Sequence, residues 1–198
     1  MPSYELENLY STEGLTVAGT DEAGRGPLAG PVFAAAVILP EGLVIEGLDD
    51  SKKISEKKRE KLFDVICSEA VSYGIASASV EEIDGLNILN ASQLAMRRAV
   101  AMLSPRPDIV LIDGNVSRGF EMQTRTVVKG DSISMSIAAA SILAKVARDR
   151  VCAELDREYP EYKLSLHKGY PTKLHMDLVR QYGPSPIHRK TFLKFLDK

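Results

Sequence analysis

The chain has 198 residues, of which 44% are hydrophobic and 26% charged, and its formal net charge at pH 7 is −2. This composition is typical of a globular protein of one domain. The slightly negative charge argues against a protein that coats nucleic acid indiscriminately, although a local basic groove stays compatible with it. Cys67 and Cys152 lack the spacing of metal ligands, so we expect isolated thiols in a reducing compartment.

The N-terminal stretch MPSYELENLY carries acidic residues and no basic segment followed by an apolar one. No apolar run approaches the ~20 residues that span a bilayer. We therefore expect a cytoplasmic protein with no membrane partner.

The first half of the chain predicts three strands and one helix. The strands are expected at residues 15–21, 31–40 and 71–80. The second of them is an almost unbroken apolar run, which is typical of a strand buried on both faces. The helix is expected at 56–70, with Ser55 as its N-cap.

The second half predicts helices around two further strands. A helix is expected over 86–103, strands at 108–113 and 123–128, and a long helix at 133–159. The remaining residues, 160–198, predict a C-terminal segment with one helix opening near Pro171 and a short last helix. The order indicates a mixed α/β sheet of about five strands with helices on its faces.

Four carboxylates follow the ends of predicted strands: Asp21, Glu22, Asp113 and Asp131. Taken singly, the first two fit a surface turn, the third fits a turn before Gly114, and the fourth fits a helix N-cap. Taken together, they flank strands that should pack side by side, so they could converge. Clustered carboxylates stay ionised only beside cations, and oxygen ligands favour Mg²⁺ or Mn²⁺ over zinc.

The stretch GTDEAGRGPLAGPV, residues 19–32, also has the glycines of a phosphate-binding loop. That interpretation is weaker, because the acids would repel phosphate unless cations lay between them. Neighbouring residues of a regular strand face opposite sides of a sheet. We therefore expect Glu22 to lie where the chain leaves the strand, before Gly24.

Five stretches of the chain resemble ribonuclease HII in order and spacing: TDEAGRGPLAGPV, LDDSKKIS, LIDGN, VKGDSISMSIAAASILAKVARDR and HKGYPTKLH. The resemblance covers almost the whole chain. It implies one ribonuclease H-like catalytic domain over residues 1–198, with 160–198 as a C-terminal helical segment of the same unit. It also implies an endoribonuclease that cleaves the RNA strand of RNA–DNA hybrids and incises DNA duplexes at embedded ribonucleotides, leaving 3′-hydroxyl and 5′-phosphate ends.

The resemblance assigns catalytic and metal-binding roles to Asp21, Glu22, Asp113 and Asp131, with two ions of Mg²⁺ or Mn²⁺ during catalysis. Two such ions lie about 3.5–4 Å apart, one activating water and one stabilising the leaving oxygen.

The resemblance also implies substrate contacts in two loops. Gly24, Arg25 and Gly26 would lie against the minor groove and read the ribose 2′-hydroxyl with backbone groups, which glycine allows. Tyr170 would stack on the sugar after the ribonucleotide; its ordinary alternative is a surface or core tyrosine.

Basic and small residues supply the other expected substrate contacts. Lys52 and Lys53 lie in a loop and are expected to hold phosphates. Ser134, Lys145 and Arg148 share one face of the long predicted helix and could approach a phosphate backbone, although the same face would also suit helix packing. For three scattered histidines we expect structural or phosphate-contacting roles rather than metal ligation: His167, His175 and His188.

Two other classes of protein fit part of the pattern. One is a nucleic-acid-binding module without chemistry, which the four acids disfavour. The other is a different ribonuclease H-like nuclease, such as a resolvase or an integrase-type enzyme. The final TFLKFLDK lacks the leading glutamine of a clamp-binding tail, so we expect no obligate protein partner, and a monomer suffices.

Overall fold

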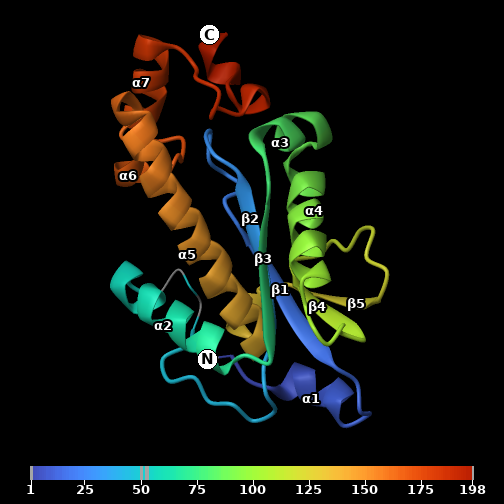
Figure 1. Cartoon of the computed structure of the whole chain (residues 1–198). Helices are drawn as coiled ribbons and strands as arrows, with labels where there is room; N and C mark the ends of the chain where they lie inside the picture. Colours follow the sequence, from blue (N-terminus) through green and yellow to red (C-terminus); the bar gives the residue numbers. More distant parts are fainter. Residues whose placement is uncertain (1, 50, 52–53, 198) are drawn as a thin grey trace.

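Figure 1 shows the computed structural model of the chain, which describes residues 2–49, 51 and 54–197. Five strands form one mixed sheet in the order β3-β2-β1-β4-β5. Strands β1, β2 and β3 are joined antiparallel, and β4 and β5 run parallel to β1. Their bounds are Val17–Ala23 (β1), Val32–Ile38 (β2), Ser72–Ala78 (β3), Ile109–Asp113 (β4) and Gln123–Val127 (β5). The expected mixed sheet of about five strands is confirmed.

Helices cover both faces of this sheet (Figure 1). One face carries α2 (Glu56–Glu69) and the long α5 (Met135–Glu158), and the other carries α4 (Ile88–Ala101). The central strand β2 is buried on both faces, as its apolar run predicts. Ala34 and Ala36 belong to the core beneath α4, whereas Ala35 and Val37 belong to the core beneath α5.

Two glycines let the helices approach the strand backbones. A Cβ on Gly19 of β1 would lie 2.4 Å from the backbone nitrogen of Ile137 in α5. A Cβ on Gly74 of β3 would lie 2.2 Å from the carbonyl oxygen of Ala99 in α4. Side chains alternate along a strand, so the contact at Gly19 also turns Asp21 towards α5.

Three short α-helices are absent from the sequence prediction: α1 (Glu5–Ser11), α3 (Val80–Leu86) and α6 (Leu164–His167). The predicted helix over 86–103 begins instead at Ile88, because Asn87 has φ 65° and its side chain caps the new helix at Asn90. A capping box between Ser79 and Glu82 starts α3.

The C-terminal part packs around its own small core. It contains α6 (Leu164–His167), α7 (Lys173–Tyr182) and two 3-10 turns, Lys190–Phe192 and Lys194–Leu196, where one short helix was expected. Its apolar side chains form one cluster with Leu28 and Ala29, which directly precede β2. The C-terminal segment therefore lies beside the loop that follows β1.

Within the part of the chain that the structure describes, no helix combines the length and the apolar character needed to cross a membrane. Cys67 and Cys152 are both free thiols, as expected.

Candidate active site

The open end of β1 places two acidic side chains at the edge of the sheet. The parallel register joins Val17–Thr20 of β1 to β4, whereas the pairing with β2 continues to Ala23. The edge of β1 that faces β4 is therefore unpaired at Glu22, and Asp21 Oδ1 accepts the Glu22 N–H there at 2.7 Å. Glu22 is expected where the chain leaves the strand; it is the last residue but one of β1, which ends at Ala23, and the ladder to β2 still includes it.

Both acids nevertheless open onto one cavity of about 270 Å³. Its wall is built from the end of β1, the following glycine loop, the end of β4, one side of α5 and a tyrosine before α7. The lining residues are Asp21, Glu22, Ala23, Gly24, Arg25, Gly26, Ser51, Asp113, Ser141, Lys145 and Tyr170.

The carboxylates of this cavity repel one another. Burial, followed by the charges of Glu22 and Asp113, raises the pKa of Asp21 well above its ordinary value, against a hydrogen bond from Ser141. Burial also raises the pKa of Glu22, against the lowering effect of Arg25. The Arg25 Nη1 lies 3.2 Å from Glu22 Oε1. A positive charge placed among these side chains would restore their ionised forms.

Asp113 and Asp131 are linked through a short turn. Asp113 ends β4, and its Oδ1 accepts the Gly130 N–H at 2.6 Å. Gly130 opens the 3-10 turn Gly130–Ser132, which carries the buried Asp131. The structure thus brings Asp21, Glu22 and Asp113 to one cavity and Asp131 to the adjoining turn, outside the residues that line the cavity.

The donor set suits a hard cation. Within residues 2–49, 51 and 54–197, no group of three or more His, Cys, Asp or Glu side chains is arranged so that it could hold a metal ion by itself. Magnesium is ordinarily held by one or two carboxylates, with waters and substrate phosphates completing its shell. A cation of this kind would relieve the mutual repulsion of the Asp21, Glu22 and Asp113 carboxylates.

The glycine loop forms the opposite wall of the cavity. Gly24 has φ +97°, and a Cβ there would lie 2.0 Å from Arg148 Nε. Gly26 faces Tyr170, whose Cε1 would lie 3.5 Å from a Cβ on that glycine. The structure therefore brings Gly24, Arg25 and Gly26 together with Tyr170. The two glycines differ: a side chain at Gly24 would collide with Arg148, whereas a Cβ at Gly26 would only touch Tyr170.

Two residues of the predicted basic helix face do not reach this cavity. Ser134 is completely buried, where it caps α5 at Ile137 and donates to Glu7 Oε1 at 2.6 Å. Arg148 is 1% exposed and donates to the Lys168 carbonyl at 2.9 Å, beneath the glycine loop. The structure contradicts a direct substrate contact for either, because packing against the rest of the chain covers them.

Lys145 and Tyr170 do reach the cavity. Lys145 Nζ donates to Asp149, which is buried, and the lysine side chain is partly exposed. Tyr170 is 41% exposed. The predicted phosphate contacts Lys52 and Lys53 lie outside the described residues.

Sequence reasoning missed Ser51 and Arg189. Ser51 lines the cavity, and its hydroxyl lies 2.9 Å from that of Ser141. Arg189 is completely buried and donates to the Gly24 carbonyl at 2.7 Å. Ser51 belongs to LDDSKKIS, one of the stretches that carry the family resemblance. The contact of Arg189 with the glycine loop becomes visible only in the fold.

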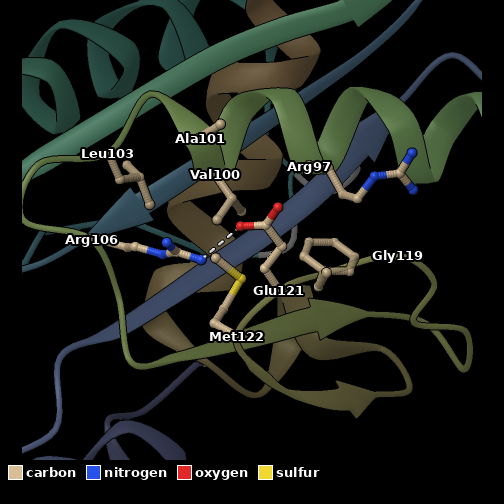
Figure 2. Close-up of a pocket in the computed structure, with 9 residues that line it drawn as sticks. Arg97, Val100, Ala101, Leu103, Arg106, Gly119, Glu121 and Met122 are labelled. Atoms are coloured by element: carbon tan, nitrogen blue, oxygen red, sulfur yellow. Dashed lines mark hydrogen bonds and ion pairs between the residues drawn. The ribbon is translucent and has the colours of Figure 1, made fainter.

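A second cavity, of about 360 Å³, lies between α4 and the segment before β5. Figure 2 shows Val100, Leu103 and Met122 around it and an ion pair between Arg106 and Glu121 at its rim. The acid that lines this cavity, Glu121, is paired with Arg106, whereas three neighbouring carboxylates line the first cavity. The acidic cavity is therefore the candidate active site, although it is the smaller of the two.

Solved structures with the same fold define the class of protein. The crystal structure of ribonuclease H2 from Pyrococcus horikoshii OT3 aligns with a TM-score of 0.76 and 28% identity, over 92% of this chain and 97% of that one. The ribonuclease HII of the PCNA complex from Archaeoglobus fulgidus aligns with a TM-score of 0.72 and 24% identity, over 89% and 94%. Bst-RNase HIII in complex with Mn²⁺ shares the fold at 17% identity, with a TM-score of 0.68, over 92% and 65%. The fold is ribonuclease H-like.

Sequence comparison narrows the class to one family. The family model described as Ribonuclease HII matches residues 18–195. Ribonuclease HII of Clostridioides difficile (strain 630) is 51% identical over 195 residues, which are 96% of this chain and 76% of that protein. Ribonuclease HII of Marinomonas sp. (strain MWYL1) is 58% identical over 177 residues, 89% of each chain. The chain belongs to the ribonuclease HII family and is a ribonuclease H hydrolase.

Proposed function

We propose that this protein hydrolyses the RNA strand of RNA–DNA hybrids and incises DNA duplexes at embedded ribonucleotides. Family membership supports endoribonuclease activity on hybrids. The observation that carries the finer proposal is the composition of one cavity: Asp21, Glu22 and Asp113 line one side, and the glycine loop with Tyr170 lines the other. Such a cavity can bind a phosphodiester and the neighbouring sugar at the same time.

In this proposal the four carboxylates, including Asp131, hold two divalent cations, Mg²⁺ or Mn²⁺. When bound, such cations supply an activated water and stabilise the leaving oxygen of a phosphodiester. The protein would use Asp21 and Asp113 most directly, since they directly follow Thr20 and Ile112, the last pair of the ladder between β1 and β4. Cleavage would leave 3′-hydroxyl and 5′-phosphate ends.

The other residues bind and orient the substrate. Backbone groups of Gly24, Arg25 and Gly26 would read the 2′-hydroxyl, the group that distinguishes RNA from DNA. Tyr170 would stack on the next sugar, and Lys145 would approach a phosphate. Arg25 would exchange its pairing with Glu22 for the substrate or solvent, because a cation at Glu22 would replace its charge.

Three labelled duplexes of one sequence test the proposal: an RNA–DNA hybrid, a DNA duplex with one ribonucleotide, and all-DNA. With Mg²⁺ or Mn²⁺ the protein should cut the first two and spare the third, and EDTA should stop cleavage. Asp21→Asn should lower kcat by at least about 100-fold while hybrid binding persists. Asp64→Asn, the same change at an exposed position of α2, should leave kcat unchanged.

Two results would reject the proposal. Full activity in Asp21→Asn would refute the carboxylate assignment. Cleavage of an all-DNA junction, with the single ribonucleotide left intact, would instead indicate a different ribonuclease H-like nuclease.

A further inference from the structure

Three segments meet directly behind the substrate cavity. The C-terminal residues 187–189 pair with the loop after β1, where the Gly30 N–H donates to the Ile187 carbonyl and the Arg189 N–H donates to the Leu28 carbonyl, each at 2.8 Å. The Leu28 N–H in turn donates to the Gly169 carbonyl at 2.8 Å. The loop after β1 is thus bonded both to the C-terminal stretch and to Gly169, the residue before Tyr170.

Arg189 holds the glycine loop from its buried side. Its guanidinium donates to the carbonyl oxygens of Gly24, Arg25 and Gly30 at 2.7, 3.0 and 2.9 Å. Burial, assisted by Arg148, lowers the pKa of Arg189 to about 9, so the group stays charged at neutral pH. A trans peptide points its N–H opposite to its C=O. The inward carbonyls therefore turn the N–H groups of Arg25 and Gly26 away from Arg189.

His188 reaches the Tyr170 segment through a chain of hydrogen bonds. His175 Nδ1 lies 3.0 Å from the Tyr170 carbonyl oxygen, which can only accept, so Nδ1 carries the proton. His175 Nε2 must then accept from His188 Nε2, 3.2 Å away. His188 Nδ1 consequently accepts from Ser185, whose N–H lies at 3.1 Å and whose hydroxyl lies at 3.0 Å. One set of neutral tautomers satisfies every bond from Ser185 to Tyr170.

The segment that carries these two residues is itself anchored. Asp84 of α3 accepts the Lys190 N–H at 2.9 Å, the Thr191 N–H at 3.0 Å and the Thr191 hydroxyl at 2.7 Å. Figure 1 shows the C-terminal segment passing beside α3. Asp84 therefore holds the backbone directly after His188 and Arg189 against α3.

We propose that His188 and Arg189 are positioning residues of the substrate cavity. Arg189 orients the peptide groups of the Gly-Arg-Gly loop, and His188, acting through His175, fixes the backbone at Tyr170. Together they fix where Gly26 and Tyr170 lie on the wall of the cavity to which the ribose would bind. Both are almost completely buried, so neither touches the substrate. The proposal rests on the proposed function of the same site.

A binding assay tests Arg189 without relying on turnover. The probes are a labelled DNA duplex with one ribonucleotide and the same duplex as all-DNA, in Ca²⁺ in place of Mg²⁺, with the integrity of the RNA checked on a gel. The ratio of their Kd values measures recognition of the 2′-hydroxyl. Arg189→Lys keeps a charge but loses the planar fork of donors. It should reduce the ratio about tenfold, a factor equivalent to about 1.4 kcal/mol.

Arg98→Lys is the matched control. Arg98 also makes three hydrogen bonds, two to Glu82 and one to the Ser77 carbonyl, but it lies on α4 away from the cavity. Its Kd ratio should equal that of the wild type. A folded Arg189→Lys with the wild-type ratio would overturn the role of Arg189.

His188 is tested by a conservative pair and a double-mutant cycle. His188→Leu removes the donor to His175 and should raise KM for the single-ribonucleotide duplex about tenfold, with a smaller effect on kcat. His188→Gln places an amide N–H near the position of Nε2 and should restore KM. In a Tyr170→Ala background the effect of His188→Leu should vanish, because His188 acts through Tyr170. An additive loss would show a general structural role and overturn the inference.

Different results would refute the proposed function and the positioning roles of His188 and Arg189. A wild type that neither prefers nor cuts the ribonucleotide duplex would refute the proposed function. A wild type that does both, with variants that discriminate equally well, would refute only the positioning inference. If Arg189→Lys does not fold, the His188 series decides.

Discussion

Alanine at Gly24 and alanine at Gly26 should have opposite consequences, although the two residues are separated only by Arg25. At Gly24 the backbone has φ +97°, which costs a side chain about 1–3 kcal/mol. The new Cβ would also lie 2.0 Å from Arg148 Nε and 2.4 Å from its Cδ. Arg148 is buried and donates to the Lys168 carbonyl, so moving it would cost about another 1.5–3 kcal/mol.

The sum for Gly24→Ala is therefore roughly 2.5–6 kcal/mol, which lowers the Tm of a chain of this size by about 5–24 °C. Gly14→Ala is the control that separates the two contributions. Gly14 has φ +78°, but nothing lies within 4 Å of its Cβ position. Gly14→Ala should thus lose only the backbone part, and denaturant unfolding of both variants isolates the contact with Arg148.

Gly26→Ala should instead fold normally and act poorly. The Cβ would lie 3.5 Å from Tyr170 Cε1, an ordinary van der Waals contact, so the free energy of unfolding should change by less than about 1 kcal/mol. The methyl group would nevertheless cover the backbone proposed to read the 2′-hydroxyl, and kcat/KM on a single-ribonucleotide duplex should fall at least about tenfold. Equal unfolding of Gly24→Ala and Gly14→Ala, or wild-type cleavage by Gly26→Ala, would refute this account.

Three further predictions concern charge and burial. Asp21→Asn should raise the free energy of unfolding at pH 7, because burial and the neighbouring acids hold the pKa of Asp21 above its ordinary value; a loss of stability in urea would contradict this. Burial lowers the pKa of His188 from 6.5 to about 4, so the unfolded chain takes up the proton first. Stability should then be lost as pH falls from about 6.5 to about 4, by at most ~3 kcal/mol, and less in His188→Gln. Ser134→Ala should lower the free energy of unfolding by about 2 kcal/mol, because α5 loses its N-cap and the buried Glu7 carboxylate loses a hydrogen-bond donor, with kcat unchanged. A reduced kcat would indicate a substrate role for Ser134.

The sheet and the clustering of acids could be predicted because both depend on patterns within short stretches of the sequence. The apolar run of β2 shows burial on both faces, and the acids follow strands whose pairing brings their ends together. The surroundings of Glu22 could not be predicted in detail, because β1 continues beyond its pairing with β4 and so exposes the second acid at an unpaired edge, just before the strand ends. Register between distant strands is not encoded in the spacing of either one.

The helices show what short sequence patterns could not predict. Periodicity found α5, but it could not tell which of its residues would reach the cavity. Ser134 and Arg148 share their face with Ser141 and Lys145, yet only the middle pair lines the cavity. The ends of that face are covered, at Ser134 by α1 and at Arg148 by the glycine loop. Coverage of this kind is decided by segments far away in the chain.

Arg189 shows why a sequence can indicate that a loop requires hydrogen-bond donors without indicating which residue supplies them. A glycine loop that leaves a strand carries carbonyl groups with no ladder partner, and buried carbonyls require donors. The sequence GRG therefore implies a donor behind the loop. Arginine is rarely buried, and Arg189 lies 165 positions beyond Gly24. Its burial is tolerable because three carbonyls surround one guanidinium, and that same arrangement leaves the loop's N–H groups available on the other side.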